Sequence, residues 1–237
     1  MNNRKLKILI IFILGIFITL GVIYRNQFFK LDKPFYTISE VYSNLEIFNL
    51  NYNFNNILLE VNNIIDNSNW IDWPEYNLIT IENNNKKKNK WTIFPFKIFG
   101  KWYDKNIKLC PKINLLLKNV PDLINASLSR LSPKTSLEPH QGWANLSNYI
   151  LRCHLGIIIP GKSYIYCDNE KRKQEINKWI IFDDSKLHWA DNDSNSDRIV
   201  LILDIKRPNY IKNGKSNINE TTELIDFINI YSPLAAD

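Results

Sequence analysis

The sequence predicts a mainly β fold, a jelly roll or similar antiparallel barrel with flanking helices, preceded by one N-terminal transmembrane helix. Three observations lead to this prediction. The chain has 237 residues, of which 45% are hydrophobic, enough to form the core of one sizeable domain. Its second half contains short apolar segments separated by polar turns, and no helix between them is long enough to connect parallel strands. A long apolar run lies near the N-terminus.

The N-terminal segment has the features of a membrane anchor. Residues 8–24 are apolar except for Thr19, and a basic flank at residues 1–7 precedes them. A helix of this length is at the short end of what spans a bilayer. A secretory signal peptide is the alternative, but no small-residue cleavage site follows. We therefore predict a single-pass membrane protein with an uncleaved anchor and a stalk over residues 25–50. If the N-terminus is cytoplasmic, the body lies in a lumen like that of the endoplasmic reticulum.

The first part of the body is predicted to contain two helices and several short strands. Apolar residues recur at helical spacing over residues 54–65, which predicts an amphipathic helix. Residues 66–108 mix tryptophan and proline with short apolar stretches such as 91–96, which indicates edge strands and loops. A brief helical pattern follows over residues 113–117.

After these helices the pattern changes to short strands. Residues 149–159, 163–167, 179–182 and 198–205 are apolar segments bounded by polar or Pro-Gly turns. Their lengths and punctuation are typical of an antiparallel sheet. Residues 219–231 again place apolar side chains at helical spacing, which predicts a closing helix in the C-terminal tail.

Composition and charge exclude several classes of protein. Seven Gly and three Cys are too few for a collagen-like chain or a disulfide framework. The net charge of +6 comes mostly from the N-terminus, because residues 34–237 hold 24 basic and 23 acidic residues. The Lys86–Lys88 run follows three Asn and is typical of a solvated loop. We therefore predict no nucleic-acid partner, since such a partner needs a basic face with aromatic residues.

Histidine and arginine residues gather in the strand-rich segment. All three His residues of the chain fall there: His140 at a loop-to-strand junction, His154 on a predicted strand and His188 after a turn. Arg152 lies two residues before His154, so their side chains point to the same face of the strand. Arg198 begins the next strand, ten residues after His188.

This combination indicates a metal site beside a site for a dicarboxylate. Two His residues from separate strands can hold Fe(II), Zn or Cu, and two arginines can bind two carboxylates through bidentate hydrogen bonds. Iron with a dicarboxylate in a jelly roll points to oxygenase chemistry driven by 2-oxoglutarate. The alternatives are that the histidines are core residues and that Arg152 pairs with Asp183 or Asp184. Those two aspartates are themselves typical of turn formation.

Four motifs in order connect this region to a known family. They are a Pro-His-x-Gly, a Leu-Arg-x-His-Leu-Gly, a Phe-Asp-Asp-Ser-x-x-His and an Arg ten residues after the last His. Together they resemble the aspartyl/asparaginyl β-hydroxylase family, which consists of 2-oxoglutarate- and Fe(II)-dependent oxygenases on a double-stranded β-helix. The resemblance is specific over residues 127–208 and weaker back to Trp91.

The resemblance implies how the metal is held. By position, His140 and His188 are identified as the iron ligands. An ordinary site with two His residues and one carboxylate has Asp or Glu two residues after the first His, but Gly142 occupies that place. The resemblance implies that water fills the missing position in this family. Asp183 and Asp184 are then candidates for orienting His188.

The resemblance also implies how 2-oxoglutarate is held. Ser129 and Arg198 would bind the carboxylate far from the metal, and Arg152 with His154 would contact the carboxylate near it. O2 would bind at an open position of the iron. We therefore expect the catalytic residues to be His140, His188 and Arg198.

Several positions depart from the family pattern. The family often has Trp and Gly between the second and third of these strands, where this chain has Gln174 and Asn177. Trp189 replaces a frequent acidic residue, and Lys206 replaces a frequent Trp. Because these positions lie outside the expected iron and co-substrate set, we expect them to affect substrate recognition.

The predicted activity is hydroxylation of an unactivated C–H bond, at the β-carbon of Asp or Asn residues in a protein or peptide substrate. The alternatives are hydroxylation of a lipid acyl chain and a non-catalytic jelly roll that binds a ligand. The predicted organisation is a basic flank, an anchor, a stalk, a catalytic domain and a tail with a helix, at residues 1–7, 8–24, 25–50, 51–208 and 209–237.

Overall fold

The computed structural model describes residues 11–12, 14–18, 30–42, 53–80 and 90–231. The chain divides into two compact units. One comprises Met1–Asp32 and Pro208–Lys212, and the other Lys33–Arg207 and Asn213–Asp237. The second unit contains both β-sheets and all the His and Arg residues of the predicted site.

The predicted membrane anchor is corrected by the structure. Within residues 8–24, the described residues 11–12 and 14–18 are helical, and the remainder lies outside the described part of the chain. A helix that crosses a bilayer needs about 20 consecutive, predominantly apolar residues. Over the described residues, no helix has the length and apolar character for this. The predicted single-pass membrane localisation is therefore wrong.

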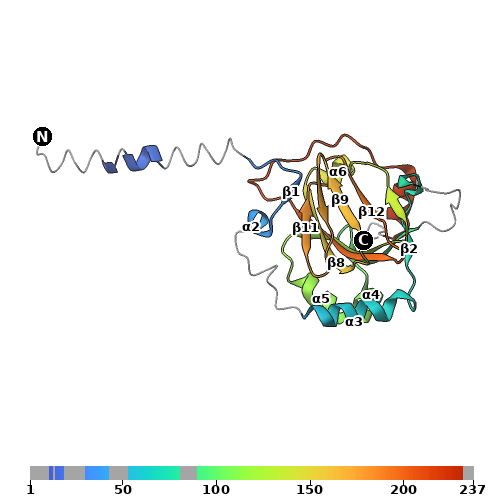
Figure 1. Cartoon of the computed structure of the whole chain (residues 1–237). Helices are drawn as coiled ribbons and strands as arrows, with labels where there is room; N and C mark the ends of the chain where they lie inside the picture. Colours follow the sequence, from blue (N-terminus) through green and yellow to red (C-terminus); the bar gives the residue numbers. More distant parts are fainter. Residues whose placement is uncertain (1–10, 13, 19–29, 43–52, 81–89, 232–237) are drawn as a thin grey trace, which may run out of the picture. The chain divides into compact units, whose positions relative to one another are not determined.

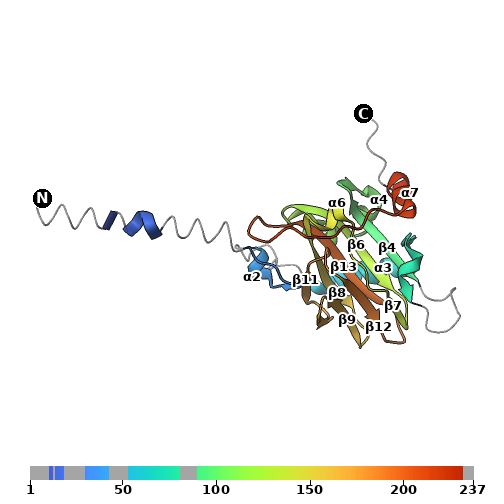
Figure 2. The ribbon, with the colours of Figure 1, turned by 90° about the horizontal axis from the view of Figure 1, so that it is seen from above.

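The larger sheet is antiparallel throughout and carries the longest strands. Its strand order is β1-β11-β8-β13-β6-β4-β2, with β5 paired to β4. These strands are β1 Phe35–Tyr36, β2 Ile71–Asp72, β4 Trp91–Ile98, β5 Lys101–Trp102, β6 Leu123–Leu131, β8 Ile150–Ile158, β11 Trp179–Phe182 and β13 Arg198–Lys206. In Figure 2 its long central strands, β8, β13, β6 and β4, are visible. Strand β1 comes from the predicted stalk and pairs with β11.

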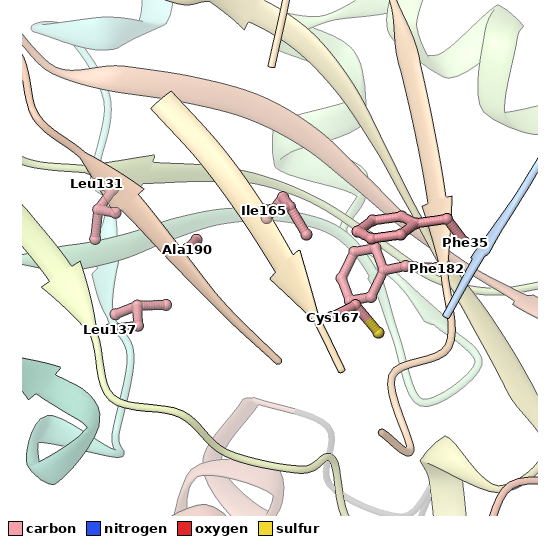
Figure 3. Packing of buried hydrophobic residues seen from close by; sticks show 7 residues of the cluster. All are labelled: Phe35, Leu131, Leu137, Ile165, Cys167, Phe182 and Ala190. Carbon is pink, nitrogen blue, oxygen red and sulfur yellow. The ribbon is translucent and has the colours of Figure 1, made fainter. Parts of the chain in front are cut away.

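The smaller sheet is also antiparallel and has the order β10-β9-β12-β7-β3. Its strands are β3 Ile79–Thr80, β7 Thr135–Leu137, β9 Ser163–Cys167, β10 Glu170–Lys173 and β12 His188–Asn192. Apolar side chains from both sheets meet in one cluster, shown in Figure 3: Phe35, Leu131, Leu137, Ile165, Cys167, Phe182 and Ala190. Two antiparallel sheets packed over a shared core are the architecture of a jelly roll. The mainly β, jelly-roll part of the predicted fold is confirmed, whereas the predicted N-terminal transmembrane helix is not supported.

Helices flank the larger sheet. They are α2 Ile38–Val41, α3 Phe54–Ile65, α4 Asp104–Leu109, α5 Pro111–Lys118, α6 Ala144–Ser147 and α7 Thr222–Tyr231, with a 3-10 helix at Tyr76–Leu78. Helices α3, α4 and α5 lie side by side in Figure 1, and α3 contacts both α5 and β8. Alternate residues of β8, Leu151, Cys153 and Leu155, are fully buried, because these helices cover the face of β8 that points away from the smaller sheet.

The sequence predicted the positions of α3, α5, α7, β4, β8, β9, β11 and β13. The positions of the other helices and strands were not predicted. Strand β4 was expected at an edge, but it pairs with β6 on one side and β2 on the other. Its Pro95 is tolerated because the pairing register with β6 shifts between Pro95 and Lys97. Strand β6 was not predicted, because small residues such as Ala126, Ser127 and Ser129 weaken its apolar alternation.

A buried carboxylate joins α3 to the start of α5. Glu60 accepts hydrogen bonds from the backbone N–H groups of Lys112 (2.7 Å) and Ile113 (2.9 Å), two donors that have no partner inside the helix. We expect Glu60→Ala to lower the free energy of unfolding by about 1–3 kcal/mol, the usual effect of leaving buried polar groups unpaired. Urea unfolding measures this, with the exposed Glu223→Ala of α7 as the control. Equal stabilities of the two variants would contradict the prediction.

Candidate active site

A cavity of about 370 Å³ lies between the two sheets. All six residues that the sequence singled out line it: Ser129, His140, Arg152, His154, His188 and Arg198. They come from β6, the segment after β7, β8, β12 and β13. The fold therefore brings together side chains that are up to 69 positions apart in the sequence.

The two histidines expected at the metal are neighbours across an antiparallel bridge. The backbone N–H of His140 donates to the carbonyl of His188 (3.0 Å), and the N–H of His188 donates back to the carbonyl of His140 (2.8 Å). Residues paired in this way place their side chains on the same face. The two ring centroids are 4.4 Å apart, so the backbone itself pairs the two imidazoles.

Both imidazoles are held in the form that binds a metal. Nδ1 of His140 lies 2.7 Å from the carbonyl oxygen of Glu138, and Nδ1 of His188 lies 2.8 Å from that of Lys186. A carbonyl oxygen can only accept, so Nδ1 carries the proton and the lone pair of Nε2 stays available. Burial lowers the pKa of His140 to about 3 and that of His188 to about 4. Both rings are therefore neutral at pH 7 and suited to a divalent metal.

No third ligand completes this pair. Across the described residues, no group of three or more His, Cys, Asp or Glu side chains is arranged to hold a metal ion. Gly142 has no side chain to offer, and an added Cβ there would collide with Oδ2 of Asp184. Oδ1 of Asp184 lies 3.3 Å from Nε2 of His188. Asp184 therefore faces the nitrogen that is free for a metal, and the carbonyl of Lys186, not an aspartate, orients the His188 ring.

Arg152 forms ion pairs with two buried carboxylates. Its Nη1 is 2.5 Å from Oδ1 of Asp184, and its Nε is 2.8 Å from Oδ1 of Asp204, which lies directly opposite it on β13. Burial lowers the pKa of the guanidinium, but the two carboxylates outweigh it and hold that pKa above its ordinary value. The pairing with Asp184 that the sequence left open is present, whereas Asp183 pairs with Arg207 instead (2.6 Å).

Three other side chains offer hydrogen-bond donors to the cavity. Arg198 is 2% exposed, and its Nη2 has no hydrogen-bond partner within the described structure; the same holds for Nε2 of the buried His154. Ser129 Oγ accepts a hydrogen bond from Nε1 of Trp91 (3.0 Å), so its own hydrogen remains to be donated. Buried donors without partners are costly, and an anion removes that cost. These residues fit a carboxylate.

Arg198 remains charged although it is buried. Burial lowers the pKa of the guanidinium to about 10, while Asp191 acts in the opposite direction, so the side chain stays charged at pH 7. Burial together with the charge of Arg198 lowers the pKa of His154 well below its ordinary value. His154 is thus neutral and can donate one hydrogen bond.

A second cavity of about 600 Å³ adjoins the first. The two share Trp91, Arg152 and Ile202 as lining residues. The walls of the second cavity are mostly apolar and include Trp73, Trp143, Leu146, Ile93, Ile98 and Phe227. Polar residues also line it, namely Lys97, Asn125, Ser127, Asp204 and, where it meets the first cavity, Arg152. An apolar molecule or chain could therefore lie beside the histidine pair.

Two buried residues at the site escaped the sequence analysis. Gln174, noted only as a departure from the family pattern, accepts a hydrogen bond from Arg198, and Asp204 pairs with Arg152. The sequence contains a signal that could have identified Asp204. It is the one acidic residue inside an otherwise apolar strand, and a buried charge requires a partner. No sequence pattern marks Gln174 as a buried residue.

The stability of the metal-free chain is expected to fall as the pH drops from about 6.5 towards 4. In the unfolded chain a histidine has a pKa of about 6.5, whereas in the folded chain His140 and His188 have values of about 3 and 4. Between these values the unfolded state binds more protons, so protonation favours unfolding. Each histidine contributes a slope of up to about 1.4 kcal/mol per pH unit.

Buried carboxyls oppose this trend. Burial raises the pKa of Asp184 to about 6 against the effect of Arg152, and it also raises the pKa values of Glu75 and Asp191. Through these groups the folded chain gains some stability as the pH falls. Urea unfolding at several pH values with a chelator measures the net effect. The slope should be smaller in His140→Gln, and an equal slope in the two proteins would refute the assignment to His140.

Comparisons with known proteins agree with the motifs. Residues 51–208 match a family model described as aspartyl/asparaginyl beta-hydroxylase. An ornithine lipid ester-linked acyl 2-hydroxylase from Rhizobium tropici is 34% identical over 122 residues, which cover 50% of this chain and 42% of that protein. The aspartyl/asparaginyl beta-hydroxylase of Homo sapiens is 32% identical over 133 residues, covering 54% of this chain and 17% of that protein.

A solved structure described as an oxidoreductase of the 2OG-Fe(II) oxygenase family, from Burkholderia pseudomallei, aligns with a TM-score of 0.39 and 11% identity. The alignment covers 53% of this chain and 72% of that one. Each of the two curated relatives named above is matched over less than half of its own length.

Proposed function

Because the chain belongs to the aspartyl/asparaginyl β-hydroxylase family, we propose that it is a 2-oxoglutarate- and Fe(II)-dependent dioxygenase. The reaction would convert a C–H bond of the substrate to C–OH, with O2 consumed and 2-oxoglutarate converted to succinate and CO2. The residues proposed for it are the six that line the cavity between the sheets.

One observation supports this proposal above the others: a single cavity between the sheets is lined both by a pair of histidines suited to a metal and by buried donors without partners. His140 and His188 leave Nε2 free for a metal. Arg198 and His154 each aim an unpartnered donor at the same cavity. A core that served packing alone would not leave charged and polar donors without partners.

Each residue has a definite task in this proposal. When bound, Fe(II) with 2-oxoglutarate supplies the O2-dependent chemistry that attacks an unactivated C–H bond. His140 and His188 hold the metal as neutral ligands, and Arg198 with Ser129 binds the far carboxylate of 2-oxoglutarate. His154 donates to the near carboxylate, while the two sheets exclude water from the site.

Arg152 has a second task in this proposal, besides the contact with the near carboxylate that its motif implied. Its guanidinium already contacts Asp184 and Asp204, yet it lines both cavities. We propose that it fixes Asp184 beside the metal position and presents its remaining edge to the near carboxylate. An arginine without these two ion pairs would bind the near carboxylate only and would not position Asp184.

The first candidate substrate is an Asp or Asn side chain of a protein, hydroxylated at the β-carbon. The human relative is named for this activity. The second candidate is a lipid acyl chain, which the name of the Rhizobium tropici relative suggests. The apolar walls of the second cavity, among them Trp73, Trp143 and Phe227, favour the second candidate, since an acyl chain gains free energy by leaving water.

Succinate formation by the full chain tests the proposal. The protein is loaded with Fe(II) without oxygen, mixed with 2-oxoglutarate and then exposed to O2, alone, with Asp- and Asn-containing peptides, or with dispersed lipid. Iron-dependent succinate supports the proposal, and the addition that stimulates it and gains one oxygen atom by mass spectrometry identifies the substrate class. No succinate under any condition, with no iron retained, would overturn the proposal in favour of a non-catalytic binding module.

A further inference from the structure

Gln174 occupies an unusual place, where the chain crosses between the two sheets. It follows directly on β10 of the smaller sheet, and its backbone N–H donates to the carbonyl of Ser163 on β9 (2.9 Å). Its side chain is 2% exposed. A buried amide must find partners for its oxygen and for its two hydrogens.

The orientation of this amide is fixed by Arg198. Nε of Arg198 lies 2.6 Å from Oε1 of Gln174. An arginine Nε can only donate, so the atom that faces it must be the amide oxygen and not the amide nitrogen. Ser163 Oγ lies 2.8 Å from the same oxygen and 2.7 Å from the carbonyl oxygen of Asp191. Its single hydrogen can be donated to either acceptor, so the contact with Arg198 alone decides the orientation. The NH2 group of Gln174 therefore points the other way.

That NH2 group fixes the proton of His154. Nε2 of Gln174 lies 3.3 Å from Nδ1 of His154. Because the amide nitrogen donates, Nδ1 must accept, and the proton of the neutral imidazole must be on Nε2. This is the opposite form from that of His140 and His188, which carry the proton on Nδ1.

The side chain of Gln174 thus contacts both of the residues, Arg198 and His154, that have a donor without a partner in the cavity. Gln174 holds the guanidinium of Arg198 by Nε, while Nη2 of the same group has no partner. It also forces a proton onto Nε2 of His154, which has no partner either. We propose that Gln174 is a positioning residue that pre-orients Arg198 and His154 to bind the two carboxylates of a dicarboxylate. The inference rests on the proposed function for the identity of that dicarboxylate as 2-oxoglutarate.

The proton on His154 can be observed without any metal or co-substrate. The chain contains three His residues, so a nitrogen-15 NMR spectrum of the histidine-labelled full chain shows three rings. We expect one ring with its proton on Nε2 and two with their protons on Nδ1. In Gln174→Glu the carboxylate can still accept from Arg198 but cannot donate, so the His154 proton should appear on Nδ1. A ring that keeps its proton on Nε2 alone would overturn the proposal.

Binding of 2-oxoglutarate gives the second readout, with Mn(II) in place of iron so that no turnover occurs. Calorimetric titration of the full chain should give a dissociation constant about 10- to 100-fold higher for Gln174→Leu, the expected effect of losing the orientation of charged hydrogen bonds. Under turnover, the KM for 2-oxoglutarate should rise while kcat changes little. Ser163→Ala is the matched control, because it removes the other partner of Oε1 and leaves both proposed contacts.

The outcomes separate this inference from the proposed function. If wild-type protein binds no 2-oxoglutarate, the proposed function fails, while the NMR result still decides whether Gln174 sets the His154 proton. If wild type binds and Gln174→Leu binds equally well, the positioning role is wrong. If Gln174→Leu does not fold, Gln174→Glu replaces it in the test, because the glutamate retains the acceptor for Arg198. Binding of 2-oxoglutarate by Gln174→Glu as tight as in wild type would then overturn the positioning role of Gln174.

Discussion

Replacing His188 by Ala is expected to abolish iron-dependent turnover. The loss should exceed about 100-fold, because mutating a residue that only supports a metal ligand already lowers metal affinity or activity by about 10- to 100-fold. The reason is geometric. The metal would be held by two imidazoles, His140 and His188, and the described residues contain no third side chain arranged with them. Succinate formation and the iron retained after desalting measure the effect.

Two controls make the His188→Ala result specific. Circular dichroism should show an unchanged fold, because the backbone hydrogen bonds between residues 140 and 188 do not depend on the side chain. Lys173→Ala, on the exposed strand β10, should retain both iron and turnover. Iron binding and activity at wild-type levels in His188→Ala would remove this residue from the site.

Replacing Arg198 by Ala is expected to raise the KM for 2-oxoglutarate by roughly 30- to 4000-fold, which corresponds to the 2–5 kcal/mol typical of truncating one partner of a buried charge pair. Arg198 is charged, 2% exposed and has an unpartnered Nη2 in the cavity. Initial rates of succinate formation over a range of 2-oxoglutarate concentrations measure the effect.

Arg198→Lys provides the matched comparison. A lysine retains the charge but offers no rigid fork, so it cannot bind Gln174 and the carboxylate in the same geometry. We expect its KM to lie between those of wild type and Arg198→Ala. An unchanged KM in Arg198→Ala would refute the assignment of this residue to the far carboxylate.

Local patterns carried much of the fold prediction. Short apolar segments bounded by turns located β8, β9, β11 and β13, and helical spacing located α3, α5 and α7. Such patterns depend on residues close in sequence, because the side-chain period of an element is a local property. The pattern was weaker at β6, where small residues replace large apolar ones, and absent from the charged strand β10; neither strand was predicted. The apolar run near the N-terminus shows an error in the other direction, a predicted element that the structure does not support. Hydropathy alone predicted a membrane anchor, but the described residues contain no helix able to span a membrane.

The sequence by itself predicted the antiparallel jelly-roll class, the six residues of the candidate site and the family, because the order of the motifs and the apolar segments between turns are properties of the chain. The tertiary structure alone decided how those residues act on one another. Arg152 meets Asp204 and Gln174 meets Arg198 only through strand register and the crossing between sheets. Each contact joins positions 24 or 52 residues apart, and no local pattern encodes which buried polar groups will satisfy each other once water is excluded.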